Sequence, residues 1–203
     1  MSPRLKPNEK TGPRLIVLSA PSVAGKTTLC DLLLKDFKDI TLSVSTTTRP
    51  MRPYEKEGVH YHFVTPEVFQ AKIKANDFAE WAKVHENLYG TSKSVVDAAL
   101  AAGKRVLFDI DVQGAMSLLN AYKDKVLLVF SHPPSMQELE KRLRDRKGDS
   151  LESIEKRLQN AYNEVGWSSK FDYQITNDNL EKAYRELKST VLQECYPTPK
   201  GTR

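Results

Sequence analysis

The chain has 203 residues, of which 39% are hydrophobic and 28% are charged, a balance typical of one globular domain with a sizeable core. Its 31 basic and 26 acidic residues give a net charge of +5, which suits either nucleic acid or a small polyanionic substrate. No apolar run is long enough to span a bilayer, and the first residues lack the apolar stretch of a secretory signal. Cys30 and Cys195 match no disulfide or zinc spacing, so we expect free thiols in a reducing cytoplasm.

Four apolar runs along the chain indicate the core of the fold. After a proline-containing leader (1–14), runs at 15–19, 106–110, 126–130 and 173–176 lack polar alternation, as is typical of strands buried on both faces. Helical periodicity follows the first and the last of these runs. The alternation predicts an α/β fold with a parallel sheet that ends before a short tail (196–203).

Two segments depart from this rhythm. Residues from about 45 to 89 alternate in short pieces and contain a short helix, which Thr65 is expected to cap and Pro66 to begin. This pattern indicates a β-rich insertion in the α/β core. The segment from 139 to 157 is unusually rich in charged residues.

The strongest local motif follows the first predicted strand and precedes a helix, which is the context of a phosphate-binding P-loop. It comprises Ala20, Pro21, Ser22, Val23, Ala24, Gly25, Lys26, Thr27 and Thr28. Backbone N–H groups would hold the phosphates, Lys26 would bridge the β- and γ-phosphates, and the Thr27 hydroxyl would bind Mg²⁺. An ordinary strand–turn–helix is the alternative, which Gly-Lys-Thr-Thr makes much less favoured. Ala20 and Val23 depart from the usual glycines, so the loop is expected to be strained or reshaped.

Charged residues recur in two further places. Arg49 and Arg52 lie in a segment that two prolines stiffen, and arginine forks bind phosphate in a bidentate manner. On these residues alone, a solvated basic turn is an equally good interpretation. Asp109 lies at the end of the strand at 106–110, as the acid of a Mg²⁺-handling strand should. Asp111 lies two residues further on, and on the same face if the strand continues, and two acids in this place could instead cap the following helix.

In these and other segments the chain resembles the guanylate kinases, over about residues 14–195. The segments are SVSTTTRPMRP (43–53), GVHYHFV (58–64), FAEWAKVHENLYGTS (78–92), VLFDIDVQGA (106–115), KRLRDR (141–146), SIEKRL (153–158) and TNDN (176–179). The family transfers the γ-phosphoryl group of ATP to GMP, giving GDP and ADP. The resemblance implies a single domain (15–195) with a P-loop NTPase-type core (15–44, 103–138 and 158–195), a GMP-binding insertion (45–102) and a helical lid (139–157).

The resemblance also implies roles for individual residues. Arg49, Arg52, Tyr61 and Tyr89 would hold the GMP phosphate, and Ser45, Glu80, Thr91 and Asp111 would bind the guanine. Glu80 is decisive, because guanine presents N1–H and N2–H₂ side by side, and a carboxylate accepts both hydrogen bonds. Adenine presents an acceptor at N1 and would leave that carboxylate unpaired.

On the ATP side, the resemblance implies a lid whose arginines close over the phosphates. Arg142, Arg146 and Arg157 would neutralise charge during transfer together with Lys26 and Arg49, while Asn177 and Asp178 would lie near the adenine. Thr27 and Asp109 would bind Mg²⁺, partly through water. A helix with surface salt bridges is the alternative for the lid segment, because acids are interspersed with its arginines.

The sequence therefore predicts a cytoplasmic ATP:GMP phosphotransferase that uses Mg²⁺, acts on ATP and GMP, and is a monomer or small homo-oligomer. A scaffold with an impaired ATP site is the alternative that the altered loop at 20–24 supports. An RNA-binding protein rests on net charge alone, since no basic-aromatic motif accompanies it.

Overall fold

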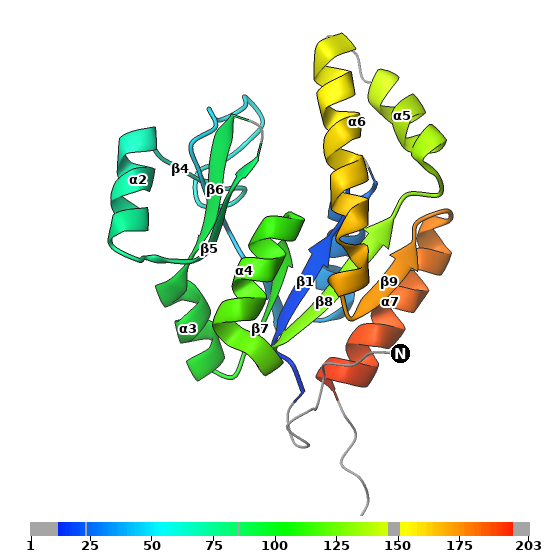
Figure 1. The fold of residues 1–203 in the computed structure, drawn as a ribbon. Coiled ribbons are helices and arrows are strands. Elements are labelled where there is room, and N and C mark those ends of the chain that lie inside the picture. Colours follow the sequence, from blue (N-terminus) through cyan, green and yellow to red (C-terminus); the bar gives the residue numbers. More distant parts are fainter. Residues whose placement is uncertain (1–11, 23, 85, 146–150, 197–203) are drawn as a thin grey trace, which may run out of the picture.

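The large sheet of the protein consists of five parallel strands. The computed structural model describes residues 12–22, 24–84, 86–145 and 151–196. The strands lie in the order β2-β7-β1-β8-β9, and every neighbouring pair is parallel (Figure 1). Their bounds are β1 Leu15–Ser19, β2 Ile40–Leu42, β7 Arg105–Asp109, β8 Val126–His132 and β9 Tyr173–Thr176. The expected α/β core with a parallel sheet is confirmed, with strands at all four predicted places.

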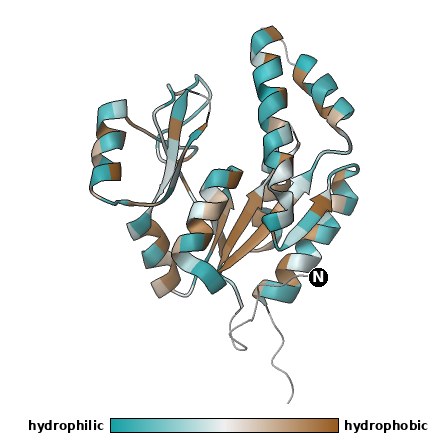
Figure 2. Cartoon of the chain, in the orientation of Figure 1, coloured by the Kyte–Doolittle hydropathy of each residue, from teal (hydrophilic) through white to brown (hydrophobic). Residues whose placement is uncertain are grey.

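Helices cover both faces of this sheet, which explains the unbroken apolar runs. Helices α1 (Lys26–Asp36) and α7 (Leu180–Cys195) pack on the face that contains Ile16 and Leu18. Helices α3 (Lys93–Ala101) and α4 (Val112–Tyr122) pack on the opposite face. Because successive side chains of a strand point to opposite faces, β1 has no solvent side and is buried throughout. Figure 2 shows the central strands of this sheet as predominantly hydrophobic.

A second, smaller sheet lies beside the large one. Its strands lie in the order β4-β3-β6-β5. Their bounds are β3 Thr46–Thr47, β4 His62–Phe63, β5 Phe78–Val84 and β6 Asn87–Ser92, and helix α2 covers Pro66–Lys74. The Thr65 hydroxyl accepts a hydrogen bond from the Val68 N–H, as expected of the cap of α2. Phe69 of α2 stacks on Phe78 with ring centroids 4.5 Å apart, which fixes the helix to the sheet.

Helices α5 (Met136–Arg144) and α6 (Leu151–Gly166) form an antiparallel pair that contains the charged segment. They pack through a separate apolar cluster of Leu139, Leu143, Ile154 and Ala161. This pair and the small sheet rise on opposite sides of the carboxyl end of β1 (Figure 1). Short 3₁₀ turns at Lys123–Lys125 and Ser168–Lys170 precede β8 and β9.

Two properties expected from the sequence can be compared with the fold. Cys30 and Cys195 are both free and both buried. Among the described residues, no helix is long and apolar enough to cross a membrane.

Candidate active site

The loop between β1 and α1 is fixed by a glycine and an asparagine. Gly25 caps α1 with a φ of +84°, a conformation that favours glycine. A Cβ atom at this position would lie only 2.5 Å from Nδ2 of Asn177. That same Nδ2 atom donates a buried hydrogen bond of 2.9 Å to the Ala24 carbonyl. Asn177, which follows β9, therefore fixes the position of this loop relative to the sheet. Val23 lies outside the described residues.

Lys26 and Thr27, the first residues of α1, both contact the end of β7. The Lys26 ammonium lies 2.8 Å from Oδ1 of Asp109 and donates to the Ile110 carbonyl at 3.2 Å. The Thr27 hydroxyl donates to Oδ2 of Asp109 at 3.4 Å. Burial by itself would lower the pKa of Lys26, but the charge and hydrogen bond of Asp109 outweigh it and raise that pKa. Lys26 is therefore a cation at any physiological pH.

A cavity of about 470 Å³ lies over this loop. Its lining residues come from the loop and the first turn of α1, together with single residues from three other segments. They are Ala20, Pro21, Ser22, Ala24, Gly25, Lys26, Thr27, Thr28, Val84, Asp111 and Glu164. The N-terminus of a helix at the floor of a cavity favours an anion, because unpaired N–H groups and the helix dipole point into it. The cavity therefore suits a phosphate chain.

Glu80 is a nearly fully buried carboxyl group on β5. It is 4% exposed, and its Oε1 accepts a hydrogen bond of 2.7 Å from the Thr91 hydroxyl on the neighbouring strand β6. Burial raises the pKa of Glu80 to about 7, the Thr91 hydrogen bond opposes this rise, and the charge of Asp111 adds to it. A carboxyl group this deeply buried is costly to maintain, which is typical of a functional site.

Asp111 caps α4 beside Glu80. Its Oδ1 accepts a hydrogen bond of 2.8 Å from the Gly114 N–H, so the capping interpretation of this acid is correct. A Cβ atom at Gly114 would lie 2.6 Å from Oε2 of Glu80 and 3.3 Å from Oδ1 of Asp111. The glycine therefore makes room for two carboxyl groups in one small space.

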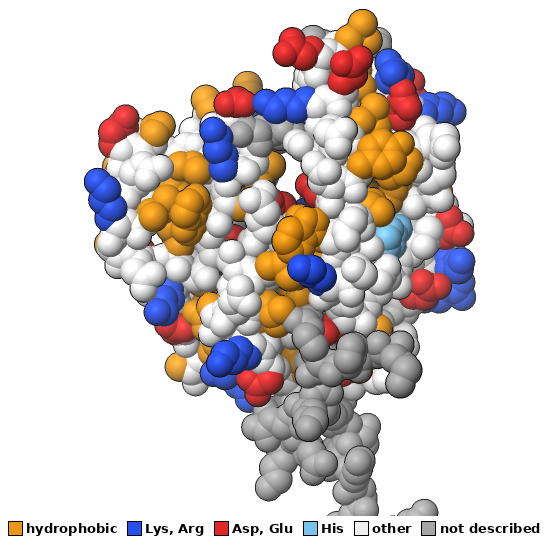
Figure 3. Space-filling model, viewed as in Figure 1, with side chains coloured by type: hydrophobic (Ala, Val, Ile, Leu, Met, Phe, Trp, Pro, Cys, Tyr) orange, Lys and Arg blue, Asp and Glu red, His pale blue; other side chains and the backbone are white. Residues whose placement is uncertain are grey.

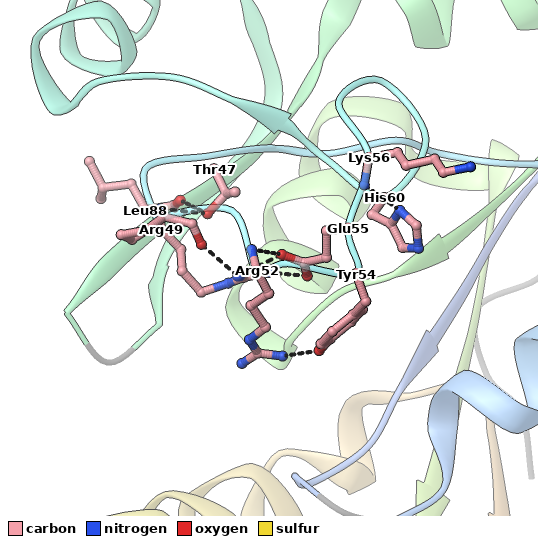
Figure 4. A network of polar contacts seen from close by, with 9 residues as sticks. Thr47, Arg49, Arg52, Tyr54, Glu55, Lys56, His60 and Leu88 are labelled. Carbon is pink, nitrogen blue, oxygen red and sulfur yellow. Dashed lines mark hydrogen bonds and ion pairs between the residues drawn. The ribbon is translucent and has the colours of Figure 1, made fainter.

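Arg49 and Arg52 lie in the loop between β3 and β4, where Glu55 contacts both residues (Figure 4). The two terminal nitrogens of Arg49 donate to the two carboxylate oxygens of Glu55 at 2.9 and 2.7 Å. The Arg52 N–H donates to the same carboxylate at 2.7 Å. The hydrogen bonds from Arg49 hold the pKa of Glu55 down at about 2, so the pair is ionised at any physiological pH.

Aromatic rings complete the surroundings of Arg49. Its guanidinium carbon lies 5.3 Å from the centroid of Tyr61 and 5.8 Å from that of Phe63. Tyr61 in turn contacts Tyr89 edge to face at 5.9 Å. Three of the four residues expected at the GMP phosphate are thereby in one cluster.

Five of the eight residues expected at GMP line a cavity of about 200 Å³ that adjoins the loop cavity, whereas Arg49, Arg52 and Thr91 do not. Its lining residues are Lys26, Ser45, Tyr61, Glu80, Ala82, Val84, Tyr89, Asp109, Ile110 and Asp111. Lys26, Val84 and Asp111 line both cavities. A further cavity of about 430 Å³ places Arg49 and Arg52 opposite Arg157 of α6. Figure 3 shows the molecule hollowed between its two upper parts, where these spaces lie.

Arg142 on α5 and Asp178 after β9 have local partners. Arg142 pairs with Glu138 one turn earlier on α5, at 3.2 Å, and Arg144 pairs with Glu140 in the same way. These two ion pairs are of the kind that the alternative for this segment, a helix with surface salt bridges, predicts. Asp178 accepts from the Asn179 N–H and pairs with Lys182 in α7. Arg146 lies outside the described residues.

Two acids of the site were missed by the sequence analysis. Glu55 follows Arg52 at a spacing of three, the same spacing that separates the two arginines, and this regularity is a signal that was available. Glu164 on α6 lines the loop cavity, and its Oε2 is buried without a hydrogen-bond partner among the described residues. Burial raises the pKa of Glu164 to about 7. A glutamate within a helical pattern carries no signal that would have distinguished it.

A strand, a loop that ends in Gly-Lys-Thr and a helix at the carboxyl edge of a parallel sheet define a P-loop NTPase core, and this fold belongs to that class. The cavity that Glu80 lines adjoins the cavity over this loop, so the site has room for two ligands side by side.

Comparisons with known proteins agree with this placement. The family model described as Guanylate kinase matches residues 12–194. The guanylate kinase of Myxococcus xanthus (strain DK1622) is 48% identical over 182 residues, which are 89% of this chain and 86% of that one. That of Chelativorans sp. (strain BNC1) is 46% identical over 89% of this chain and 83% of its own. The crystal structure of guanylate kinase from Anaplasma phagocytophilum has a TM-score of 0.77 at 30% identity, covering 94% of this chain and 90% of that one. The chain belongs to the guanylate kinase family.

Proposed function

We propose that this protein transfers the γ-phosphoryl group of ATP to GMP, giving ADP and GDP. The observation that carries the proposal is the pair of adjoining cavities that share Lys26. One is built for a phosphate chain, and the other is built around a buried carboxyl group. Two substrates bound there would meet at Lys26, as a direct transfer between them requires.

The smaller cavity would hold the guanine. Glu80 would accept hydrogen bonds from N1–H and N2–H₂, and the Thr91 hydroxyl keeps its carboxylate in place. Ser45 and Asp111 line the same space and would contact the rest of the base edge. Adenine would leave a buried carboxylate facing an acceptor, so the pocket selects against AMP.

The GMP phosphate would lie against Arg49, Arg52, Tyr61 and Tyr89. Arginine forks and phenolic hydroxyl groups are donors to phosphate oxygens, and this set supplies both. The acceptor is already an anionic phosphate, so the reaction needs no general base to create a nucleophile. The chemical task is to neutralise charge and to align the two phosphates.

ATP would bind with its phosphates over residues 20–28, on the N–H groups at the start of α1. Lys26 would hold the β- and γ-phosphates, and Arg142, Arg146 and Arg157 would approach from the lid during transfer. For Arg142 this requires leaving Glu138, a half-exposed pairing that is worth little in water. Asn177 and Asp178 would lie on the adenine side.

Thr27 and Asp109 would hold Mg²⁺, which supplies charge neutralisation of the phosphates when bound. Both residues offer oxygen atoms, the ligands that this cation prefers, and these atoms already lie within 3.4 Å of each other. We further propose that the core, the GMP-binding insertion and the lid have the sequence bounds given above, and that the protein works in the cytoplasm.

A coupled assay of ADP formation with ATP, GMP and Mg²⁺ tests the proposal. We expect GMP-dependent ADP formation and GDP as the second product. GMP binding without GDP formation at high protein concentration would instead indicate the scaffold, an alternative that the close similarity to enzymes named guanylate kinase does not favour.

A further inference from the structure

Glu55 is hydrogen-bonded to both arginines that are expected to bind the GMP phosphate. Its side chain is 5% exposed, and both of its oxygens accept hydrogen bonds from that site. Oε1 takes one terminal nitrogen of Arg49, while Oε2 takes the other and the Arg52 N–H. The carboxylate therefore lies behind the arginines, where it is not available to a ligand.

These contacts leave one edge of the Arg49 guanidinium for a phosphate. A guanidinium has five N–H groups, of which Glu55 takes two and the Pro50 carbonyl takes one at 2.8 Å. The bonds leave the Nε–H and one terminal N–H, which lie side by side as a second fork, and the Tyr89 hydroxyl also interacts with the Arg49 side chain. With Tyr61 and Phe63 against its face, the guanidinium plane is held in one orientation.

We propose that Glu55 is a positioning residue, which orients the side chain of Arg49 and the backbone of Arg52 so that both arginines bind one phosphate of GMP. The inference rests on the proposed function for the identity of the ligand. Long arginine side chains lose considerable rotamer freedom when they bind an anion, and Glu55 removes that freedom beforehand for Arg49. For Arg52 it fixes the backbone from which the side chain extends. A preorganised pair binds phosphate more tightly although an acid stands beside it.

If only net charge mattered, the effect of Glu55 on phosphate affinity would have the opposite sign. Arg49, Arg52 and Glu55 together carry a net charge of +1, and neutralising Glu55 raises this to +2. If Glu55 only balances charge, Glu55→Gln should bind a phosphate dianion more tightly. If it positions the arginines, the same change should weaken binding, because the amide presents N–H₂ to an arginine nitrogen.

The experiment measures dissociation constants for GMP, guanosine and ATP by calorimetry in the whole protein. We expect Glu55→Gln to lose at least tenfold in GMP affinity and to keep guanosine and ATP affinity within twofold. Glu55→Asp, which keeps the charge but shortens the side chain, should lose GMP affinity as well. Glu67→Gln, an exposed acid on α2, removes the same charge from the insertion and should change none of the three.

Two outcomes would overturn the inference. Equal or tighter GMP binding by Glu55→Gln would indicate charge balance, and equal losses for GMP and guanosine would indicate a merely structural role. If Glu55→Gln does not fold, Glu55→Asp decides by the same ratio of GMP to guanosine affinity. Failure of the wild type to form GDP would refute the proposed function, yet the binding ratio would still decide the role of Glu55.

Discussion

At the scale of single residues, Glu80 is a buried carboxyl group that must be ionised to accept both guanine donors. Its carboxyl group is held by Thr91, and Gly114 leaves room for it beside the cap of α4. Burial raises the pKa of Glu80 to about 7, so this carboxyl group titrates near neutral pH. Guanine would supply two donors that favour the charged form, so binding of the base and loss of the proton are linked.

We expect Glu80→Gln to impair GMP use far more than ATP binding. The amide keeps one acceptor but places an N–H₂ group against a guanine donor, so at least one charge-assisted hydrogen bond is lost. Such a bond is worth about 1.5–3 kcal/mol, which corresponds to a fall of roughly 10- to 150-fold in kcat/KM for GMP. Steady-state kinetics with each substrate varied in turn measures this, and an unchanged kcat/KM would remove Glu80 from the guanine site.

Guanosine affinity should depend on pH with an apparent pKa near 7. Below that value the carboxyl group is protonated and cannot accept both guanine donors, so affinity should fall about tenfold for each pH unit. Guanosine is used because a phosphate group titrates near pH 6 by itself. Binding measured by calorimetry between pH 5 and 8.5 checks this. Glu80→Gln should abolish the dependence, and a variant that retains it would assign the titration to another group.

At the scale of elements, the P-loop is held by a strand that is distant in sequence. Gly25 at the start of α1 and Asn177 after β9 meet so closely that no Cβ atom fits between them. The side chain of Asn177 also takes up the Ala24 carbonyl, which would otherwise be a buried acceptor without a partner. The position of the loop relative to the sheet therefore depends on both residues.

Gly25→Ala should weaken ATP binding at least tenfold and leave GMP affinity within twofold. The methyl group would displace Asn177, and a positive φ costs an alanine about 1–2 kcal/mol. Gly166→Ala is the matched control, because nothing lies within 4 Å of a Cβ atom there at the end of α6. Calorimetry with a non-hydrolysable ATP analogue measures the effect. Normal ATP affinity in Gly25→Ala would mean that the loop does not depend on this contact.

Whether a strand could be predicted from the sequence depends on how much of its surface is buried. Strands β1, β7 and β8 were predicted because both of their faces are covered, which makes the apolar run continuous. Strand β9 lies where it was predicted, but the expectation that it is buried on both faces was wrong, because it is the last strand at the edge of the sheet and Gln174 and Thr176 are exposed. Strand β2 was not predicted, because Thr41 and Leu42 are exposed at the edge of the sheet and the apolar run is lost. Helix α2 was predicted from its cap alone, since Thr65 and Pro66 act locally.

Less of the candidate site than of the fold could be predicted from the sequence. The P-loop is contiguous, so its spacing could be recognised, whereas Glu80 and Thr91 meet only through the pairing of β5 with β6. Their roles came from the family resemblance. The contact of Asn177 with Ala24 joins residues 153 positions apart, and no local pattern encodes it. Glu164 was missed because the sequence of a helix with many polar residues does not indicate which of them faces the interior.

At the scale of the whole molecule, Glu80 and Glu164 give the stability a dependence on pH. Burial raises the pKa of each to about 7, above the ordinary glutamate value of 4.5 that applies to the unfolded chain. The folded state therefore binds more protons than the unfolded state between these values. By linkage, the free energy of unfolding should be highest at low pH with respect to these two groups and should fall as pH rises from about 4.5 to about 7.

Glu164→Gln should reduce that fall and make the protein more stable at pH 8 than the wild type, by on the order of 2 kcal/mol. Glu155→Gln, an exposed acid on the same helix, should change the stability at neither pH. Denaturant unfolding at pH 5 and pH 8 gives the comparison. Equal pH dependence in Glu164→Gln and wild type would show that this carboxyl group is not the source.

The contact between Lys26 and Asp109 has a consequence for the form in which ATP is accepted. The Lys26 ammonium already contacts Asp109 and the Ile110 carbonyl. If a phosphate took its place beside the ammonium, the Asp109 carboxylate would lose its cation. Asp111 and Glu164 line the same cavity, which makes an abandoned anion there still more unfavourable. In the proposed function, a triphosphate bound with a divalent cation would bring Asp109 a new cation to replace Lys26. Under the proposed function, binding would exchange the partners of the Lys26–Asp109 ion pair and of the metal–triphosphate complex, and ATP stripped of its metal by a chelator should bind poorly.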